Sequence, residues 1–124
     1  MPAFTQIIPI LRSFDEHKAK ECYLDYLGCT LDWHHRFAPG LPLYFQVSRS
    51  GLVLHLSEHH GDATPGSSVH IKMTGLHALH TELHAKRYAN LRPGIEDTPW
   101  GSWQMALIDP FGNTLRLNED RPQA

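Results

Sequence analysis

The chain has 124 residues, ten of them histidine, and imidazole both binds metal ions and transfers protons near neutral pH. His80 and His84 are four residues apart, so they share one face if their segment is helical. A zinc-binding helix with this spacing has a glutamate directly after its first histidine, whereas this chain has Thr81. Since His77 and Tyr88 continue the same stripe beside a row of leucines, the pattern predicts an exposed helix flank.

Two further pairs, His34–His35 and His59–His60, are direct neighbours in the sequence. Adjacent side chains point to opposite faces in extended backbone, so neither pair chelates an ion easily and solvated loops are expected. Motifs for covalent catalysis are missing as well, because there is no nucleophile elbow, no glycine-rich phosphate loop and no cysteine beside a base. The residues therefore predict no catalytic group, no cofactor and no metal site.

The overall composition is that of one small globular domain, residues 1–124. Hydrophobic residues make up 41% of the chain and the formal net charge is −2. Lysine and arginine form no cluster, which excludes a nucleic-acid partner, and the apolar runs are too short for a membrane span or a signal peptide. Cys22 and Cys29 are expected to be reduced packing residues, as in a cytoplasmic protein.

The elements that position these residues follow one plan twice. In the first half, strands are predicted over 6–11, 30–37, 43–49 and 52–57, with a hairpin turn at Ser50-Gly51. A helix lies between the first two strands; Ser13 is its predicted N-cap, with Glu16 completing a capping box, and Gly28 ends it. Its buried face is expected to carry Ala19, Cys22, Tyr23, Tyr26 and Leu27.

After a turn-rich linker over 58–66, the second half repeats the order. Strands are predicted over 67–73, 91–95, 103–108 and 114–117, and Thr74 is the predicted N-cap of a helix with a stripe of Leu76, Leu79 and Leu83. This duplication predicts an α+β fold of two β-α-β-β-β modules, about 1–62 and about 66–124. Pairing of the two sheets encloses a cleft, and exchange of halves between two chains closes it in a homodimer.

Two motifs connect this plan with a known family. Tyr23-Leu24-Asp25-Tyr26-Leu27-Gly28 closes the first helix, and Asp109-Pro110-Phe111-Gly112-Asn113 forms the tight turn before the last strand. With these motifs in this order, the chain resembles the glyoxalase/bleomycin resistance/dioxygenase superfamily, which has the vicinal oxygen chelate fold. The resemblance covers nearly the whole chain. It implies the fold more strongly than the function, since this fold hosts lyases, dioxygenases, epimerases and non-catalytic binders.

Enzymes of that superfamily bind a metal ion through residues of four strands. The resemblance places the corresponding positions at Ile8, His55, Ser68 and Arg116. A divalent ion needs several His, Asp or Glu side chains that converge at about 2 Å, and of these four residues only His55 qualifies. A register shifted by two residues brings in His70 on the same strand face, and two histidines without a carboxylate make a weak site.

The bleomycin-resistance branch, which lacks the metal ligands, matches better. Its Pro-Trp-Gly element before the last hairpin corresponds to Pro99-Trp100-Gly101, and its groove aromatic after the first helix corresponds to Trp33. The resemblance implies a groove in which ring faces stack on a flat heteroaromatic ligand. Core packing is the alternative role for Trp33 and Trp103. The expected ligand-binding residues are Trp33, Phe37, Phe45, His55, His70, Trp100, Trp103 and Arg116.

The predicted function is non-catalytic binding and sequestration of a small amphipathic antibiotic of the bleomycin class, which confers resistance. The expected partners are this ligand and a second copy of the chain, and a binding protein is favoured over an enzyme. Two alternatives stay open. One is a metal-dependent lyase or dioxygenase of the same superfamily, with His55, His70 and Glu119 as ligands; the other is a binder of an unrelated metabolite.

Overall fold

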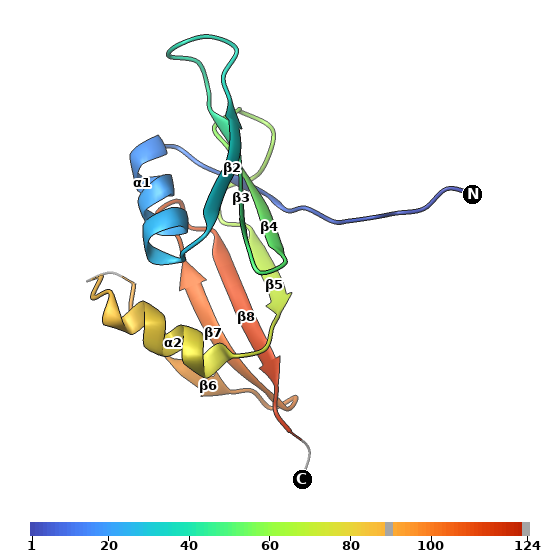
Figure 1. The fold of residues 1–124 in the computed structure, drawn as a ribbon, viewed down its shortest axis with the longest axis vertical. Coiled ribbons are helices and arrows are strands. Elements are labelled where there is room, and N and C mark those ends of the chain that lie inside the picture. Colours follow the sequence, from blue (N-terminus) through green and yellow to red (C-terminus); the bar gives the residue numbers. More distant parts are fainter. Residues whose placement is uncertain (89–90, 123–124) are drawn as a thin grey trace.

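The structure is a computed structural model that describes residues 1–88 and 91–122, and it contains two modules of the same plan (Figure 1). Module one consists of β1 (Ile10–Arg12), α1 (Glu16–Lys20), the π-helix η1 (Glu21–Tyr26), β2 (Thr30–His35), β3 (Tyr44–Arg49) and β4 (Leu52–Ser57). Module two consists of β5 (Ser68–Lys72), α2 (Leu76–Ala85), β6 (Ile95–Asp97), β7 (Ser102–Ile108) and β8 (Thr114–Asp120).

Each module forms one mixed four-stranded sheet, and the two sheets have equivalent strand orders. The order is β1-β4-β3-β2 in module one and β5-β8-β7-β6 in module two. In both, the first strand pairs in parallel with the last, while the other neighbours are antiparallel. The predicted duplication of a β-α-β-β-β unit is therefore confirmed, as is the irregular connection over 58–66.

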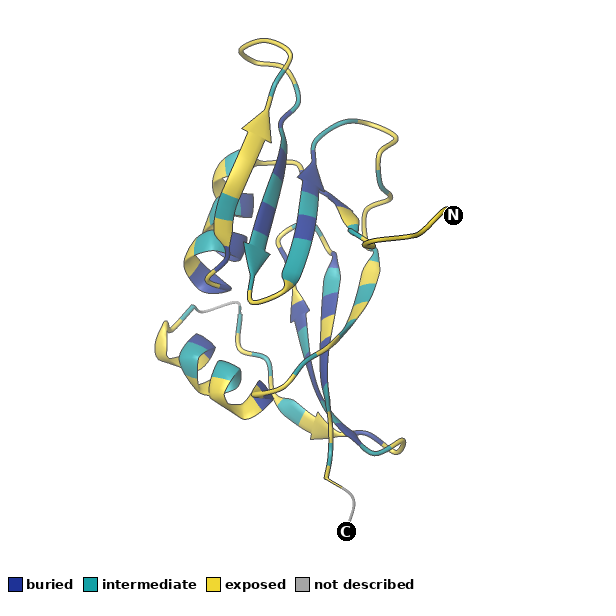
Figure 2. Cartoon of the chain, turned by 45° about the vertical axis from the view of Figure 1, so that its right-hand side comes forward, coloured by how far each residue is buried: buried dark blue, intermediate teal, exposed yellow. Residues whose placement is uncertain are grey.

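One hydrophobic core joins the helices to both sheets, because alternate residues of each strand turn toward it. On β3 and β4 these are Phe45, Val47, Leu54 and Leu56, and on β7 and β8 they are Met105, Leu107, Leu115 and Leu117. Figure 2 shows the resulting alternation of buried and more exposed positions along the central strands. The predicted buried face of the first helix is confirmed, and Cys22 and Cys29 are both buried and free, as predicted.

Both helices begin differently from the prediction. The first is capped by Asp15, whose carboxylate accepts from the Lys18 N–H at 2.9 Å, and not by Ser13. The second has Gly75 as its N-cap in place of Thr74, at a positive φ of 80°. Its free N–H groups are satisfied from outside the segment, because the Glu119 carboxylate accepts from Gly75 and Leu76. In the described residues no helix is long and apolar enough to span a membrane.

Two predicted strands are wrong in their bounds. The first was expected over 6–11, but β1 begins only at Ile10, and the residues before it form an extended arm that leaves the body of the protein (Figure 1). Its apolar residues Met1, Phe4 and Ile7 are exposed, so the apolar letters there do not mark a core strand. The strand expected over 91–95 lies instead at Ile95–Asp97, and residues 89–90 lie outside the described part of the chain.

The turn between β7 and β8 ties the two modules together. Asp109 is buried, and its carboxylate accepts from the Tyr23 hydroxyl at 2.6 Å and from the backbone N–H groups of Phe111 and Asn113. The Asn113 side-chain amide donates both to Asp109 and to the Arg12 carbonyl of β1. Burial, together with the facing carboxylate, raises the pKa of Tyr23 well above its ordinary value, so this hydroxyl remains a donor.

A second connection runs between module one and α2. The Arg49 guanidinium donates to both carboxylate oxygens of Glu82 at 2.8 Å and to the Leu27 carbonyl at 2.6 Å. The Lys86 ammonium donates to the carbonyls of Asp25 and Tyr26, at the end of the first helix. These contacts satisfy carbonyls that have no partner within the helix, and they fix α2 against the end of η1.

Candidate functional site

His55 lies at the centre of the sheet face of module one that points away from the core. We call this surface the open face of module one; it carries Ile10, Trp33, Tyr44, Gln46 and His55. In the ladder, His55 is opposite Ile10 of β1 on one side and Gln46 of β3 on the other. The strands therefore present these side chains together, on the side opposite to the buried Phe45 and Leu56.

Hydrogen bonds fix the His55 ring on both sides. The Tyr44 hydroxyl lies 2.6 Å from Nδ1, and Gln46 Oε1 lies 2.9 Å from Nε2. Since the Gln46 amide nitrogen already donates to Asp32 at 3.0 Å, its oxygen must accept from His55. The proton of the neutral ring is thereby assigned to Nε2, and Nδ1 accepts from Tyr44. Burial lowers the pKa of His55, which keeps the ring neutral at pH 7.

Aromatic rings surround this histidine. The Trp33 indole stacks on Tyr44 with ring centroids 5.9 Å apart and planes 8° from parallel. Both rings also meet the His55 ring edge to face, each with centroids 5.2 Å apart. We call Trp33, Tyr44, Gln46 and His55 the His55 cluster. Because 42% of Trp33 is exposed, the cluster offers an aromatic surface on which a planar ligand can stack.

A β-bulge places Trp33 on the open face. The register between β2 and β3 shifts between Leu31 and Trp33, and such a bulge lets the strand re-aim its side chains. Leu31 stays opposite the buried Val47, whereas Trp33 is opposite Gln46. Strict alternation would have put Trp33 on the same side as Leu31, so core packing, the alternative role, is not what the structure shows.

More aromatic residues continue the surface beyond the end of β2. Phe37 is 75% exposed, and its ring meets those of His35 and His59 edge to face at 4.8 and 6.2 Å. The His59 ring also lies 6.5 Å from Tyr44. Phe37 is thus near the His55 cluster, at the rim formed by the loop after β2.

Module two has a different group at the equivalent position. Its open face carries His70, Gln104, Ala106, Ile108 and Arg116, and Arg116 is opposite His70 and Ala106, as His55 is opposite Ile10 and Gln46. Arg116 is exposed. Within residues 1–88 and 91–122, its guanidinium makes neither a hydrogen bond nor an ion pair. At equivalent positions, module two therefore presents an exposed positive charge, whereas module one presents a neutral ring that is hydrogen-bonded on both sides.

The donors on these faces do not fit the metal site of the superfamily's enzymes. The ladder shows that Ile10 and His70, and not Ile8 and Ser68, lie beside the central residues His55 and Arg116. Ile10 has no donor atom and Arg116 is cationic, so neither position can supply a ligand. No group of three or more His, Cys, Asp or Glu that could hold an ion occurs in the described residues.

The shifted set His55, His70 and Glu119 is not assembled either. Glu119 is used at the N-terminus of α2, where its carboxylate accepts from two backbone N–H groups. It is opposite Trp103 in the ladder, so it lies on the helix side of the sheet, and His70 lies on the open face of module two. The lyase or dioxygenase alternative thus lacks the ligand set on which it depended.

Two residues predicted for the ligand site lie elsewhere. Phe45 is fully buried in the core, because it alternates with Tyr44 and Gln46 on β3. Trp103 lies on the helix side, where its ring meets His77 of α2 edge to face at 4.7 Å. Neither side chain reaches an open face, so the prediction that they contact ligand there is corrected by the strand alternation.

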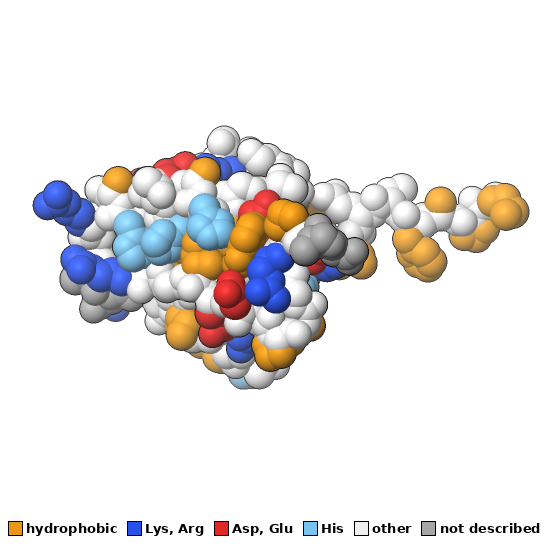
Figure 3. All heavy atoms as spheres, turned by 90° about the horizontal axis from the view of Figure 1, so that it is seen from below, with side chains coloured by type: hydrophobic (Ala, Val, Ile, Leu, Met, Phe, Trp, Pro, Cys, Tyr) orange, Lys and Arg blue, Asp and Glu red, His pale blue; other side chains and the backbone are white. Residues whose placement is uncertain are grey.

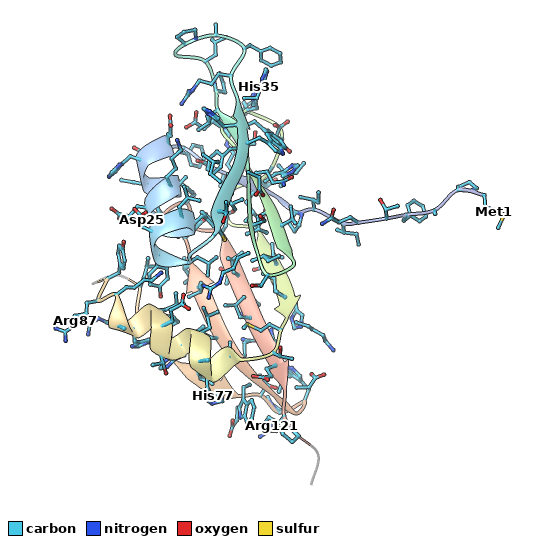
Figure 4. All side chains as sticks on the ribbon, viewed as in Figure 1. Met1, Asp25, His35, His77, Arg87 and Arg121 are labelled. Atoms are coloured by element: carbon cyan, nitrogen blue, oxygen red, sulfur yellow. The ribbon has the colours of Figure 1, made fainter. Side chains whose placement is uncertain are left out.

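Trp100 is exposed but distant from the His55 cluster within one chain. It lies in the turn between β6 and β7, beside Arg121, whose N–H donates to the Gly101 carbonyl. Figure 4 shows Arg121 at the opposite end of the protein from His35 of β2. A single chain therefore does not bring Trp33 and Trp100 to one groove.

Sequence reasoning missed three members of the site, Tyr44, Gln46 and Asp32. Their signal was the alternation of Tyr44 and Gln46 with the apolar residues of β3, which puts them on the face of His55. Asp32 also accepts from the Ser48 hydroxyl at 3.0 Å, and these side-chain hydrogen bonds from Gln46 and Ser48 lower its pKa. The hydrogen bonds thus run from Tyr44 through His55 and Gln46 to Asp32, and the last acceptor of this series is a charged carboxylate.

Comparisons with solved structures identify the fold. A bleomycin-binding protein complexed with bleomycin superposes with a TM-score of 0.74 at 21% identity, over 95% of this chain and 100% of that one. TnmS3, an antibiotic binding protein from Streptomyces sp. CB03234, gives 0.77 at 22% identity over 97% and 99%. A bleomycin-binding protein from Streptomyces verticillus, complexed with copper(II)-bleomycin, gives 0.70 at 26% identity over 99% and 100%. The predicted vicinal oxygen chelate fold is confirmed.

A family model agrees with the fold. The comparison with curated protein sequences gives no match. The model described as glyoxalase superfamily protein, however, matches residues 2–123. This match spans both modules, the helix-end motif and the Asp109 turn, as the resemblance implied. The chain therefore belongs to the glyoxalase superfamily.

Proposed function

We propose that this protein binds and sequesters a small amphipathic antibiotic of the bleomycin class without altering it, and so confers resistance in the cytoplasm. The observation that carries the proposal is the His55 cluster, a rigid aromatic surface with an exposed indole. Both nitrogens of its only histidine are already engaged in hydrogen bonds. Such a surface favours stacking over bond-making chemistry. The likeness to bleomycin-binding structures supports the same ligand class.

A homodimer is part of the proposal. Trp33 and Trp100 lie at opposite ends of one chain, so a groove that uses both needs a second copy. With one module from each chain, the aromatic open face of module one would meet the polar open face of module two. That groove would offer ring faces on one side and exposed groups such as Arg116, His70 and Glu96 on the other. It would suit a ligand with a flat ring system and several polar substituents.

The direct test is titration of metal-free bleomycin into tag-free protein, followed by tryptophan fluorescence and by heat. The expected result is submicromolar binding, about −8 kcal/mol or stronger, with quenching of tryptophan emission and one drug per groove. Copper(II)-bleomycin should be titrated in parallel, because metal binding changes the shape of the drug. Absence of heat and of quenching at high micromolar concentrations of both forms would reject bleomycin as the ligand.

Trp100→Ala tests the assigned role of Trp100. We expect it to weaken drug binding by about 1–3 kcal/mol, the range for loss of a stacking anchor. Since Trp100 is 69% exposed in the single chain, stability should change little, and circular dichroism checks that the fold is intact. Unchanged affinity in a folded variant would remove Trp100 from the groove.

A complementation experiment tests whether two chains build each groove. Trp33→Ala and Trp100→Ala chains are mixed, unfolded and refolded together, so that heterodimers form. If each groove takes Trp33 from one chain and Trp100 from the other, a heterodimer has one intact groove and one that lacks both rings. Near-wild-type affinity should then return at about a quarter of the wild-type stoichiometry, because random pairing makes about half of the dimers heterodimers and each of these has one intact groove. If both rings come from one chain, every groove stays defective and no tight site returns.

A further inference from the structure

Helix α2 carries three histidines on its outer side, away from both open faces. His77, His80 and His84 are spaced by three and four residues, so they follow one line along the helix. Figure 3, seen from below, shows histidine side chains in a row on the face where α2 lies, and Figure 4 labels His77 on this helix. The His77 ring turns to Trp103, which leaves His80 and His84 as a pair.

The two rings of this pair are close together. The centroids of His80 and His84 are 4.0 Å apart and the planes are inclined by 36°. Rings that merely shared an exposed flank would be free to separate into solvent. Here His80 is only partly exposed, so its ring is kept beside that of His84. Imidazole binds metal ions through a free ring nitrogen, and two rings this close can direct such nitrogens at one ion.

A third donor comes from outside the helix. The carbonyl oxygen of Pro93 lies 2.8 Å from His84 Nε2. Two donors that each lie about 2 Å from one ion are about 3 Å apart, so this separation suits two ligands of the same ion. In the protein without metal, the same distance corresponds to a hydrogen bond from Nε2–H to the carbonyl. For an ion to take the place of that proton, the carbonyl must move off the Nε2–H axis, so that both donors lie about 2 Å from the ion.

We propose that His80, His84 and the Pro93 carbonyl form a binding site for a divalent transition-metal ion of the nickel, copper and zinc group. Two imidazole nitrogens select these ions over magnesium and calcium, which prefer oxygen ligands. Water completes the coordination, because the site lies at the surface. The ion would fasten α2 to the segment that leads into β6, and it has no part in the open faces or in drug binding.

The test uses tag-free, chelator-treated protein and Ni²⁺ as the probe in isothermal titration calorimetry. Wild type should bind one Ni²⁺ per chain at this site. His80→Gln and His84→Gln should each weaken that binding about tenfold or more, since each removes a direct ligand. His34→Gln is the matched control, because His34 is also exposed and has a histidine neighbour, yet β2 directs the two rings apart. It should bind Ni²⁺ as wild type does.

Thermal unfolding gives an independent readout. An ion that binds only the folded chain raises its Tm by mass action, so saturating Ni²⁺ should raise the Tm of wild type and of His34→Gln more than that of His84→Gln. Circular dichroism verifies that each variant is folded without metal. The proposal is overturned if wild type lacks a one-to-one site, or if folded His80→Gln and His84→Gln bind Ni²⁺ as tightly as wild type and gain the same Tm.

Discussion

The two modules share their strand order and pairing, yet the centres of their open faces carry opposite chemistry. In module one, His55 is neutral, hydrogen-bonded on both sides and in contact with two aromatic rings. In module two, Arg116 is charged and exposed; Ala106 beside it has no side-chain hydrogen-bonding group, and the Gln104 amide donates to Glu96 instead. Tyr44 and Gln104 occupy equivalent positions, as do Gln46 and Ala106.

This difference shows what a duplicated scaffold contributes and what it leaves to the sequence. The ladders place one side chain at the centre of each face, whatever its type. Two flanking residues then decide whether that side chain is held, as His55 is by Tyr44 and Gln46, or remains available, as Arg116 does. One half can thus supply a rigid stacking surface and the other an adaptable charge, which together suit a ligand with both aromatic and polar parts.

The largest expected effect comes from removing the Asp109 carboxylate, whose hydrogen bonds join the two modules. Asp109→Ala would leave the Tyr23 hydroxyl and two backbone N–H groups buried without an acceptor, which should cost about 3–5 kcal/mol of unfolding free energy. Urea unfolding measures it. Because the turn connects two strands of module two and contacts Tyr23 and Arg12 of module one, a single unfolding transition with a lower urea midpoint is expected.

The control for that variant is Asp97→Ala, an exposed carboxylate 3.7 Å from Arg121, which should change stability by about 0.5 kcal/mol or less. Two separate transitions for Asp109→Ala, one near the wild-type midpoint, would mean that the modules are stabilised independently. The comparison would then be between two separate folding units.

The next effect concerns the aromatic face alone. Trp33→Ala should weaken drug binding by about 1–3 kcal/mol, through loss of the exposed stacking surface, as measured by calorimetry. Ile108→Ala is the control on module two, since Ile108 is apolar, 60% exposed and on the open face of that module. An equal loss from both variants would show that the faces contribute alike, against the division of roles described above.

A smaller effect is expected at the connection with α2. Arg49→Met should lower the free energy of unfolding by about 1 kcal/mol, because the ion pair with Glu82 is partly exposed to solvent. The bond to the Leu27 carbonyl is lost as well. A double-mutant cycle with Glu82→Gln separates the two contributions. A loss similar to that of Asp109→Ala would make this connection, and not the turn, the main junction.

The smallest expected effect is a pH dependence that belongs to module one. The pKa of His55 is lowered from its ordinary value of 6.5 by burial, so the unfolded chain binds the proton more readily than the folded one. Stability is therefore unaffected well above pH 6.5 and falls as the pH decreases through 6.5 toward the lower folded pKa. His55→Gln should reduce this decrease in chemical unfolding between pH 7 and 5. A fall equal to that of wild type would assign the effect to other histidines.

Much of the fold was predictable because its signals are local. The strand over 52–57 and its turn follow from alternation and from Ser50-Gly51, both of which have positive φ. The start of α2 was not predictable, because Glu119, 44 residues after Gly75, satisfies its N–H groups. The position of β6 was missed for a related reason, since this three-residue strand is defined by its pairing with β7.

The site was predictable only in part. Trp33 and His55 were expected at the ligand surface, but the bulge that turns Trp33 toward His55 depends on the register with β3. Phe45 was misplaced because an aromatic letter on a strand does not reveal which face it occupies until the neighbouring strand is known. The residue types predicted a surface of stacked aromatic rings, whereas the pairing of the strands determined which rings lie on that surface.

The Asp109 turn also has a consequence for biosynthesis. Tyr23 lies 86 positions before its acceptor Asp109, and Arg12 lies 101 positions before its donor Asn113. A nascent chain exposes the first helix and β1–β4 while their polar partners are still inside the ribosome, and contacts of such long separation form slowly. Completion of the fold thus waits for the last hairpin to emerge. A transcript truncated after β7 should yield an aggregation-prone fragment and not a functional half.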